Sequence, residues 1–99
     1  MNLAEITQRA QTALSGGGFT NKVKFDFGED GKLFIDGAAG KVTNEDGAAD
    51  ATINVSFADF VALAQGSLDP MSAFMGGKLK VLGDMSVAMK LQALFSKLR

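Results

Sequence analysis

The fold of this chain is decided by residues 59–84, which read DFVALAQGSLDPMSAFMGGKLKVLGD. Gly66 is suited to ending one helix, because glycine adopts the left-handed conformation found just after many helices. Asp69 and Pro70 are suited to beginning the next, since Asp caps free amides and Pro is tolerated in the first turn. Two glycines at 76–77 then end that helix after a few residues. The stretch therefore predicts a short helix directly after a longer one.

A strand and a further helix are predicted after the short helix. Residues 78–82 place Leu79 and Val81 between lysines, an alternation typical of a half-buried strand. Gly83 breaks the strand, and Asp84 begins a last helix that we expect to continue to about Leu98.

The rest of the chain supplies a first helix, the start of the longer helix that ends at Gly66, and four more strands. A helix is predicted from Leu3 to about Leu14, with Asn2 as its cap. Another is predicted to open at Ser56. The strands are expected at residues 22–27, 32–36, 41–44, 51–55 and 78–82. Their alternating apolar residues define one apolar face of the sheet. We expect helices to cover that face and not the other. The prediction is an α+β fold with a five-stranded, mostly antiparallel sheet.

This order of elements resembles the sterol carrier protein 2 family of small lipid-transfer domains. In that family a helix ends in Gly, a short Asp/Asn-Pro helix carries an aromatic–Met pair, and a Gly-Lys-Leu/Ile-Lys strand leads into a C-terminal helix. Here the pair is Phe74 and Met75, and the resemblance is closest over residues 50–91. Together with the length, it implies a single SCP-2-like lipid-binding domain over residues 1–99.

The resemblance also implies a function. A hydrophobic cavity between sheet and helices would bind and transfer a fatty acid, acyl-CoA, phospholipid or sterol-like lipid, without covalent chemistry. All eight aromatic residues are Phe, so a cavity they line would be apolar and poor in side-chain donors. Met suits surfaces that must accept variable shapes. The residues expected to line the cavity are Phe25, Phe27, Ile35, Ile53, Phe57, Met71, Phe74, Met75, Met85 and Met89.

The last helix is apolar on two sides. One stripe consists of Val87, Leu91, Leu94, Phe95 and Leu98. Met85 and Met89 fall nearly opposite it, so the helix has a second apolar side that needs a partner to pack against. The candidates are the chain's own short helix, a partner subunit and a bound acyl chain. A partner subunit corresponds to the alternative function, a structural or regulatory dimerisation module whose core is filled by its own side chains.

Arg9 is a candidate contact for the head group of a lipid. It is the only cation of the first predicted helix, so it could meet a carboxylate. Glu5, one turn earlier, is an equally good partner for it.

Catalysis, metal binding and nucleic-acid binding are not expected. The chain has no Cys and no His, which removes the usual nucleophiles, general bases and metal ligands. We therefore predict no enzyme, no catalytic residue, no metal and no cofactor. Glu45 and Asp46 are explained by the chemistry of an Asp-Gly turn without an ion. The net charge of −1 gives no global attraction to nucleic acid, and lysines on two predicted strands indicate a solvated sheet face.

The expected setting is cytoplasmic. Residues 1–5 have no basic start, and no segment is apolar for long enough to span a bilayer. The run 96–98 is Ser-Lys-Leu, but Arg99 follows it, so we expect no peroxisomal targeting from it. The expected partners are a hydrophobic small molecule or lipid and, transiently, a membrane surface, with the protein a monomer or a weak homodimer.

Overall fold

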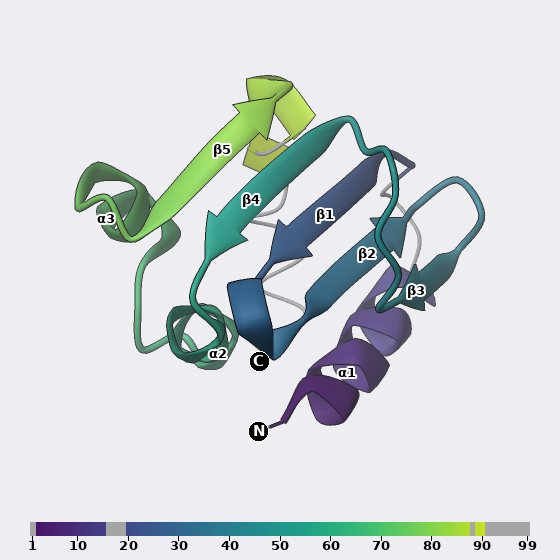
Figure 1. Ribbon diagram of the computed structural model, residues 1–99, viewed down its shortest axis with the longest axis horizontal. Coiled ribbons are helices and arrows are strands. Elements are labelled where there is room, and N and C mark those ends of the chain that lie inside the picture. Colours follow the sequence, from purple (N-terminus) through teal and green to yellow (C-terminus); the bar gives the residue numbers. More distant parts are fainter. Residues whose placement is uncertain (1, 16–19, 88, 91–99) are drawn as a thin grey trace.

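A mixed five-stranded sheet forms the centre of the computed structural model (Figure 1), which describes residues 2–15, 20–87 and 89–90. The strands are β1 (Lys22–Asp26), β2 (Lys32–Asp36), β3 (Lys41–Thr43), β4 (Ala51–Val55) and β5 (Leu79–Gly83). Their order is β3-β2-β1-β4-β5. The pair β1–β4 is parallel and the other three pairs are antiparallel, which confirms the predicted mostly antiparallel sheet in an α+β fold.

Helices begin where the sequence predicts them to begin. The described helices are α1 (Leu3–Ser15), the 3-10 turn η1 (Gly28–Asp30), α2 (Phe57–Gln65) and α3 (Pro70–Met75), and residues 85–87 and 89–90 are also helical. Each of the three α-helices has a side-chain cap, given by Asn2, Ser56 and Asp69. Their oxygens accept the backbone N–H three residues on, at 2.9, 3.1 and 3.0 Å. Gly66 ends α2 at a φ of 80°.

One hydrophobic core lies between the sheet and the helices. β1 and β2 contribute their alternate residues Val23, Phe25, Leu33 and Ile35, all between 0% and 1% exposed. The helical part of the core comes mainly from Ile6, Ala10, Phe60, Leu63 and Ala64. Val87 joins the same core, and the rest of its predicted stripe, Leu91, Leu94, Phe95 and Leu98, lies outside the described residues.

The other face of the sheet carries no helix in the described part of the chain, but residues 44–50 cross part of it between β3 and β4 (Figure 1). Lys24 Nζ lies 2.7 Å from Asp46 Oδ1, and this hydrogen bond lowers the pKa of the Asp46 carboxyl. The ring of Phe34 packs under Gly47, where an added Cβ would lie 3.2 Å from Phe34 Cε2. β4 lies between β1 and β5. Lys22 and Lys24 of β1 are therefore not on a strand next to Lys80 of β5.

We expect Gly83→Ala to destabilise the fold far more than Gly77→Ala. Both glycines have a positive φ, 100° and 76°, so each alanine costs about 1–2 kcal/mol from the backbone alone. At position 83 an added Cβ would also lie 2.5 Å from the carbonyl oxygen of Asp50, whereas at position 77 nothing lies within 4 Å. Gly83→Ala should therefore lose about 3 kcal/mol or more of unfolding free energy in denaturant titrations. Equal losses in the two variants would contradict this account.

Candidate functional site

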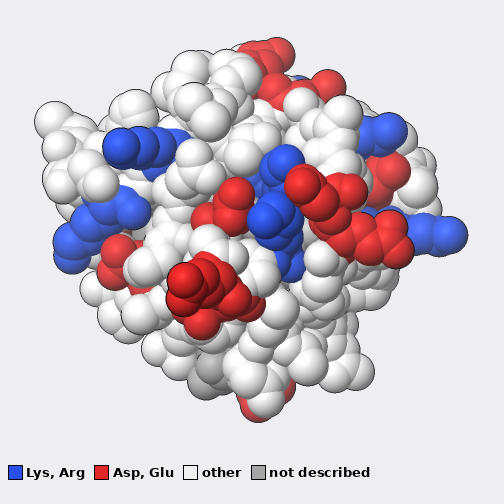
Figure 2. Space-filling view, in the orientation of Figure 1, with Lys and Arg blue, Asp and Glu red and all other residues white. Residues whose placement is uncertain are grey.

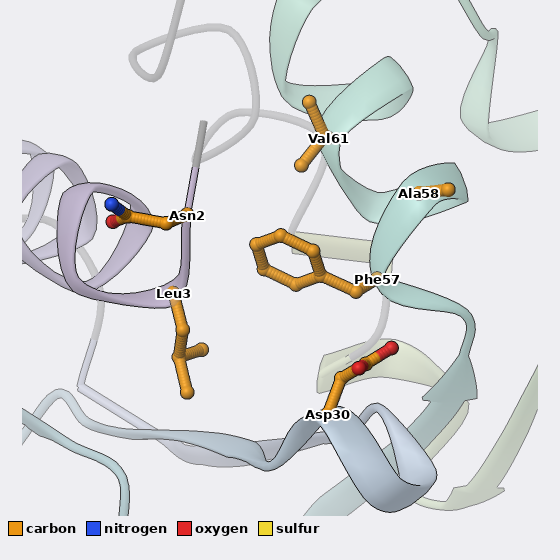
Figure 3. Close-up of a pocket in the computed structure, with 6 residues that line it drawn as sticks. All are labelled: Asn2, Leu3, Asp30, Phe57, Ala58 and Val61. Atoms are coloured by element: carbon orange, nitrogen blue, oxygen red, sulfur yellow. The ribbon is translucent and has the colours of Figure 1, made fainter.

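An open depression of about 620 Å³ lies where the start of α1, the turn η1 and the start of α2 meet (Figure 3). The described part of its lining comes from three segments that are far apart in the sequence. The lining residues are Asn2, Leu3, Asp30, Phe57, Ala58 and Val61.

Local structure fixes each wall of the depression. Asn2 is held by its capping bond to the N–H of Glu5. Leu3 packs on the β1–β2 turn, where a Cβ added to Gly31 would lie 3.0 Å from Leu3 Cδ2. That turn is closed by the N–H of Phe27, which donates to the carbonyl oxygen of Gly31 at 2.9 Å. Phe57 is the first residue of α2, so the helix cap sets its position.

Phe57 separates the depression from a group of aromatic rings in the core. Figure 3 shows its ring pointing into the depression, between α1 and α2. The same ring contacts Phe27 edge-on, with centroids 5.3 Å apart. The ring centroid of Phe27 lies 5.1 Å from that of Phe60, and the centroid of Phe60 lies 4.8 Å from that of Phe25. An apolar path therefore leads from the depression through the Phe57 ring to the buried face of β1.

Two of the described lining residues contribute polar side chains, and one of these is negatively charged. They are the exposed side chains of Asn2 and Asp30. The apolar wall consists of the half-buried Leu3, Phe57 and Val61 together with Ala58. Such a site suits an apolar group with a polar end at the rim, and the Asp30 carboxylate disfavours an anion there.

The ten residues predicted to line a cavity fall into two groups. Four lie in the core and one is half-buried beside it at the depression: Phe25, Phe27, Ile35, Ile53 and Phe57. Five are exposed, by fractions from 38% to 80%: Met71, Phe74, Met75, Met85 and Met89. The structure thus brings the first five together in and beside one core and places the other five at the surface. Contact of either group with a ligand remains a prediction.

Arg9 is exposed on α1 and is not among the described residues that line the depression. Between Glu5 and Arg9, both described, there is no ion pair. Its role as a head-group contact remains a prediction.

Sequence reasoning missed Asn2, Leu3, Asp30, Ala58 and Val61 as parts of a site. Asn2 was explained as the cap of the first helix, and the other four carry no local signal of a site. The proximity of the segments that carry them was the missing information, because local patterns do not predict such non-local contacts.

The described part of the chain contains neither a cluster of metal ligands nor a membrane-spanning helix. There, no three or more His, Cys, Asp or Glu side chains are grouped so that they could hold a metal ion. Within the same residues, no helix has both the length and the hydropathy to cross a membrane.

Comparison with known proteins places this fold in a family. Residues 3–96 match the model of the family described as the SCP-2 sterol transfer family. The chain belongs to this family. Sterol carrier protein 2 of Homo sapiens is 45% identical over 83 residues. Those residues are 80% of this chain but 15% of the human protein, so the chain corresponds to a small part of that relative.

Solved structures of the SCP-2 family have the same fold. Sterol carrier protein 2 from Aedes aegypti, solved in complex with the C16 fatty acid palmitate, has a TM-score of 0.85 at 20% identity, over 100% of both chains. The sterol carrier protein domain 2 of Helicoverpa armigera has a TM-score of 0.62 at 30% identity, over 93% of this chain and 75% of that one. The resemblance found in the sequence is thereby confirmed.

We expect Phe60→Ala and Phe57→Ala to differ in their effect on stability. Phe60 is 0% exposed and contacts the rings of Phe25 and Phe27, so its removal should cost about 3–5 kcal/mol of unfolding free energy. Phe57 is half-buried beside an open depression, so solvent replaces part of the lost ring and the cost should be clearly smaller. Chemical denaturation of both variants measures this. A Phe57→Ala loss as large as that of Phe60→Ala would show that Phe57 is ordinary core.

Proposed function

We propose that this domain binds a lipid non-covalently in the apolar interior between sheet and helices and carries it between membranes. The ligand class is a fatty acid, acyl-CoA, phospholipid or sterol-like lipid. Membership of the SCP-2 sterol transfer family over residues 3–96 is the observation that carries this function. The aromatic interior and the depression beside it give the function a place in this chain.

The depression is the proposed mouth of the binding site, and Phe57 is the side chain that a ligand displaces. Of the four clustered rings, that of Phe57 is half-buried while Phe25, Phe27 and Phe60 are between 0% and 5% exposed. Its displacement therefore loses the least packing. A ligand that takes its place against Phe27 gains about 25 cal/mol for each Å² of apolar surface removed from water. Part of that gain is offset by the ordering of the ligand.

A long acyl chain is the first ligand to test. The Aedes aegypti protein of the same fold was solved with palmitate. Displacement of the Phe57 ring would bring an acyl chain against Phe27 and its neighbour Phe60, whose rings offer apolar surface and no hydrogen-bond donor.

We further propose that the domain is a cytoplasmic carrier without catalytic activity. The sequence contains no Cys and no His, so the commonest nucleophiles and general bases are missing from the chain. Binding and release of the ligand need neither.

A fluorescent fatty-acid analogue should bind saturably and be displaced by unlabelled palmitate. Phe57→Ala should change the affinity for the analogue about tenfold, since it alters the wall that the ligand displaces. The matched control is Phe34→Ala, which removes another half-buried ring, but from the helix-free face of the sheet. It should leave the affinity unchanged. Fluorescence titration measures all three proteins, and an absence of saturable binding for every acyl or sterol probe would refute lipid carriage.

Asp30→Asn should strengthen the binding of palmitate and leave the binding of hexadecanol unchanged. The two ligands have equally long chains, but only palmitate brings a negative charge to the rim that Asp30 lines. Removing the carboxylate relieves a repulsion of about 1 kcal/mol or less in water, and added salt should weaken the effect. Competition titrations at low and high salt measure it. The same gain for both ligands would place the head group away from Asp30.

In the alternative function, a dimerisation module, the side of the last helix that carries Met85 and Met89 would face a second copy; these side chains are 47% and 66% exposed. This alternative predicts a mass that rises with protein concentration and a core that excludes apolar probes. Sedimentation equilibrium beside the titrations above separates the two functions.

A further inference from the structure

The short helix α3 presents its large apolar side chains to solvent. Met75 is 80% exposed, Met71 51% and Phe74 38%. Of the six residues of α3, all of them described, Ala73 alone is buried. An amphipathic helix ordinarily turns its large apolar residues inward. Contiguous exposed apolar surface of this kind marks a site of interaction.

Local hydrogen bonds cap α3 at both ends. The carboxylate of Asp69 accepts the N–H of Ser72 at 3.0 Å at its start. At its end, the N–H of Gly77 donates to the carbonyl oxygen of Phe74 at 3.2 Å, and that of Lys78 to Ala73 at 2.9 Å. α3 also packs beside β5, an edge strand of the sheet (Figure 1). The apolar side chains therefore project from a fixed helix.

The chain next to this apolar surface is basic. Lys78 and Lys80, both exposed, follow α3 directly. The acidic residue at the other end, Asp69, is engaged as the helix cap. Figure 2 shows basic side chains on the side of the molecule where Figure 1 places α3 and β5. Lys78 and Lys80 therefore place two positive charges beside the apolar side chains of α3, although the net charge of the whole chain is −1.

We propose that α3 docks this protein on the surface of an anionic lipid bilayer. Met71, Phe74 and Met75 enter the boundary between head groups and acyl chains, and Lys78 and Lys80 contact the anionic head groups. Apolar side chains flanked by lysines are the combination that binds peripheral proteins to such surfaces. The unbranched Met side chains adapt to a fluid partner.

A second copy of this chain fits the same surface less well. A symmetric contact would bring each patch against its own copy and so place lysines opposite lysines. Three large side chains on a six-residue helix also present much less area than the roughly 800 Å² per partner of a stable interface. The bilayer requires neither a large rigid area nor an opposing patch.

Vesicle co-sedimentation of the full chain tests this docking surface. Vesicles of phosphatidylcholine with phosphatidylglycerol should bind the protein more tightly than vesicles of phosphatidylcholine alone. Lys80→Glu should weaken binding to the anionic vesicles at least about fivefold. Lys41→Glu is the matched control, because it makes the same change at an exposed position of β3, the opposite edge strand. It should have little effect. Met75→Ser should also weaken vesicle binding, with an unchanged thermal midpoint because Met75 is so exposed.

The outcomes are distinguishable from those for lipid carriage. Lys80→Glu should leave binding of the soluble fatty-acid analogue unchanged, so docking and carriage fail separately. Docking through α3 is overturned if the wild-type protein does not bind anionic vesicles, if Lys41→Glu weakens binding as much as Lys80→Glu, or if Met75→Ser has no effect. A concentration-dependent mass that Met75→Ser abolishes would overturn it in favour of a second copy.

Discussion

The contact of Phe60 with Phe25 and Phe27 is the interaction on which the rest of the structure depends. It joins α2 to β1, two elements more than thirty residues apart in the sequence, with ring centroids 4.8 and 5.1 Å apart. β1 is the central strand of the sheet, so this contact fixes α2 over the middle of the apolar face. The same placement puts Phe57, the first residue of α2, against Phe27 and at the depression. The candidate site is therefore a consequence of core packing.

The parallel pairing of β1 with β4 imposes a second constraint. A parallel pair needs a long connection, and here the connection includes β2, β3 and the segment 44–50 that returns to β4. Two contacts hold that segment on the helix-free face of the sheet. They are the ion pair between Asp46 and Lys24 and the packing of Gly47 against the ring of Phe34. At its end, Asp50 exchanges bonds of 2.8 and 3.0 Å with the backbone of Lys22. Lys24 and Asp46 thus help to secure the topology on this face.

The features that could be predicted from the sequence are those that depend on residues close together along the chain. Caps at Asn2, Ser56 and Asp69 and the alternation of the strands have local physical causes, and the structure confirms them. The buried face of α2 was predicted in large part. The expected stripe was Phe57, Phe60, Val61 and Ala64; Phe60 and Ala64 are buried, and Phe57 and Val61 are partly buried against the core. Leu63 is buried as well, and the pattern did not single it out because α2 is apolar at nearly every position. The depression was missed because its residues meet only through the tertiary fold.

The distribution of Phe and Met separates two physical tasks that composition alone merges. Phe25, Phe27 and Phe60 are buried and contact one another, which gives the interior a defined shape. Every described Met, by contrast, is exposed, at positions 71, 75, 85 and 89. Helical spacing predicted that Met85 and Met89 lie on the side of the last helix opposite the buried Val87. Helical spacing does not tell what that side contacts. A rigid aromatic interior and an adaptable methionine exterior suit a protein that holds one apolar partner inside and meets another at its surface.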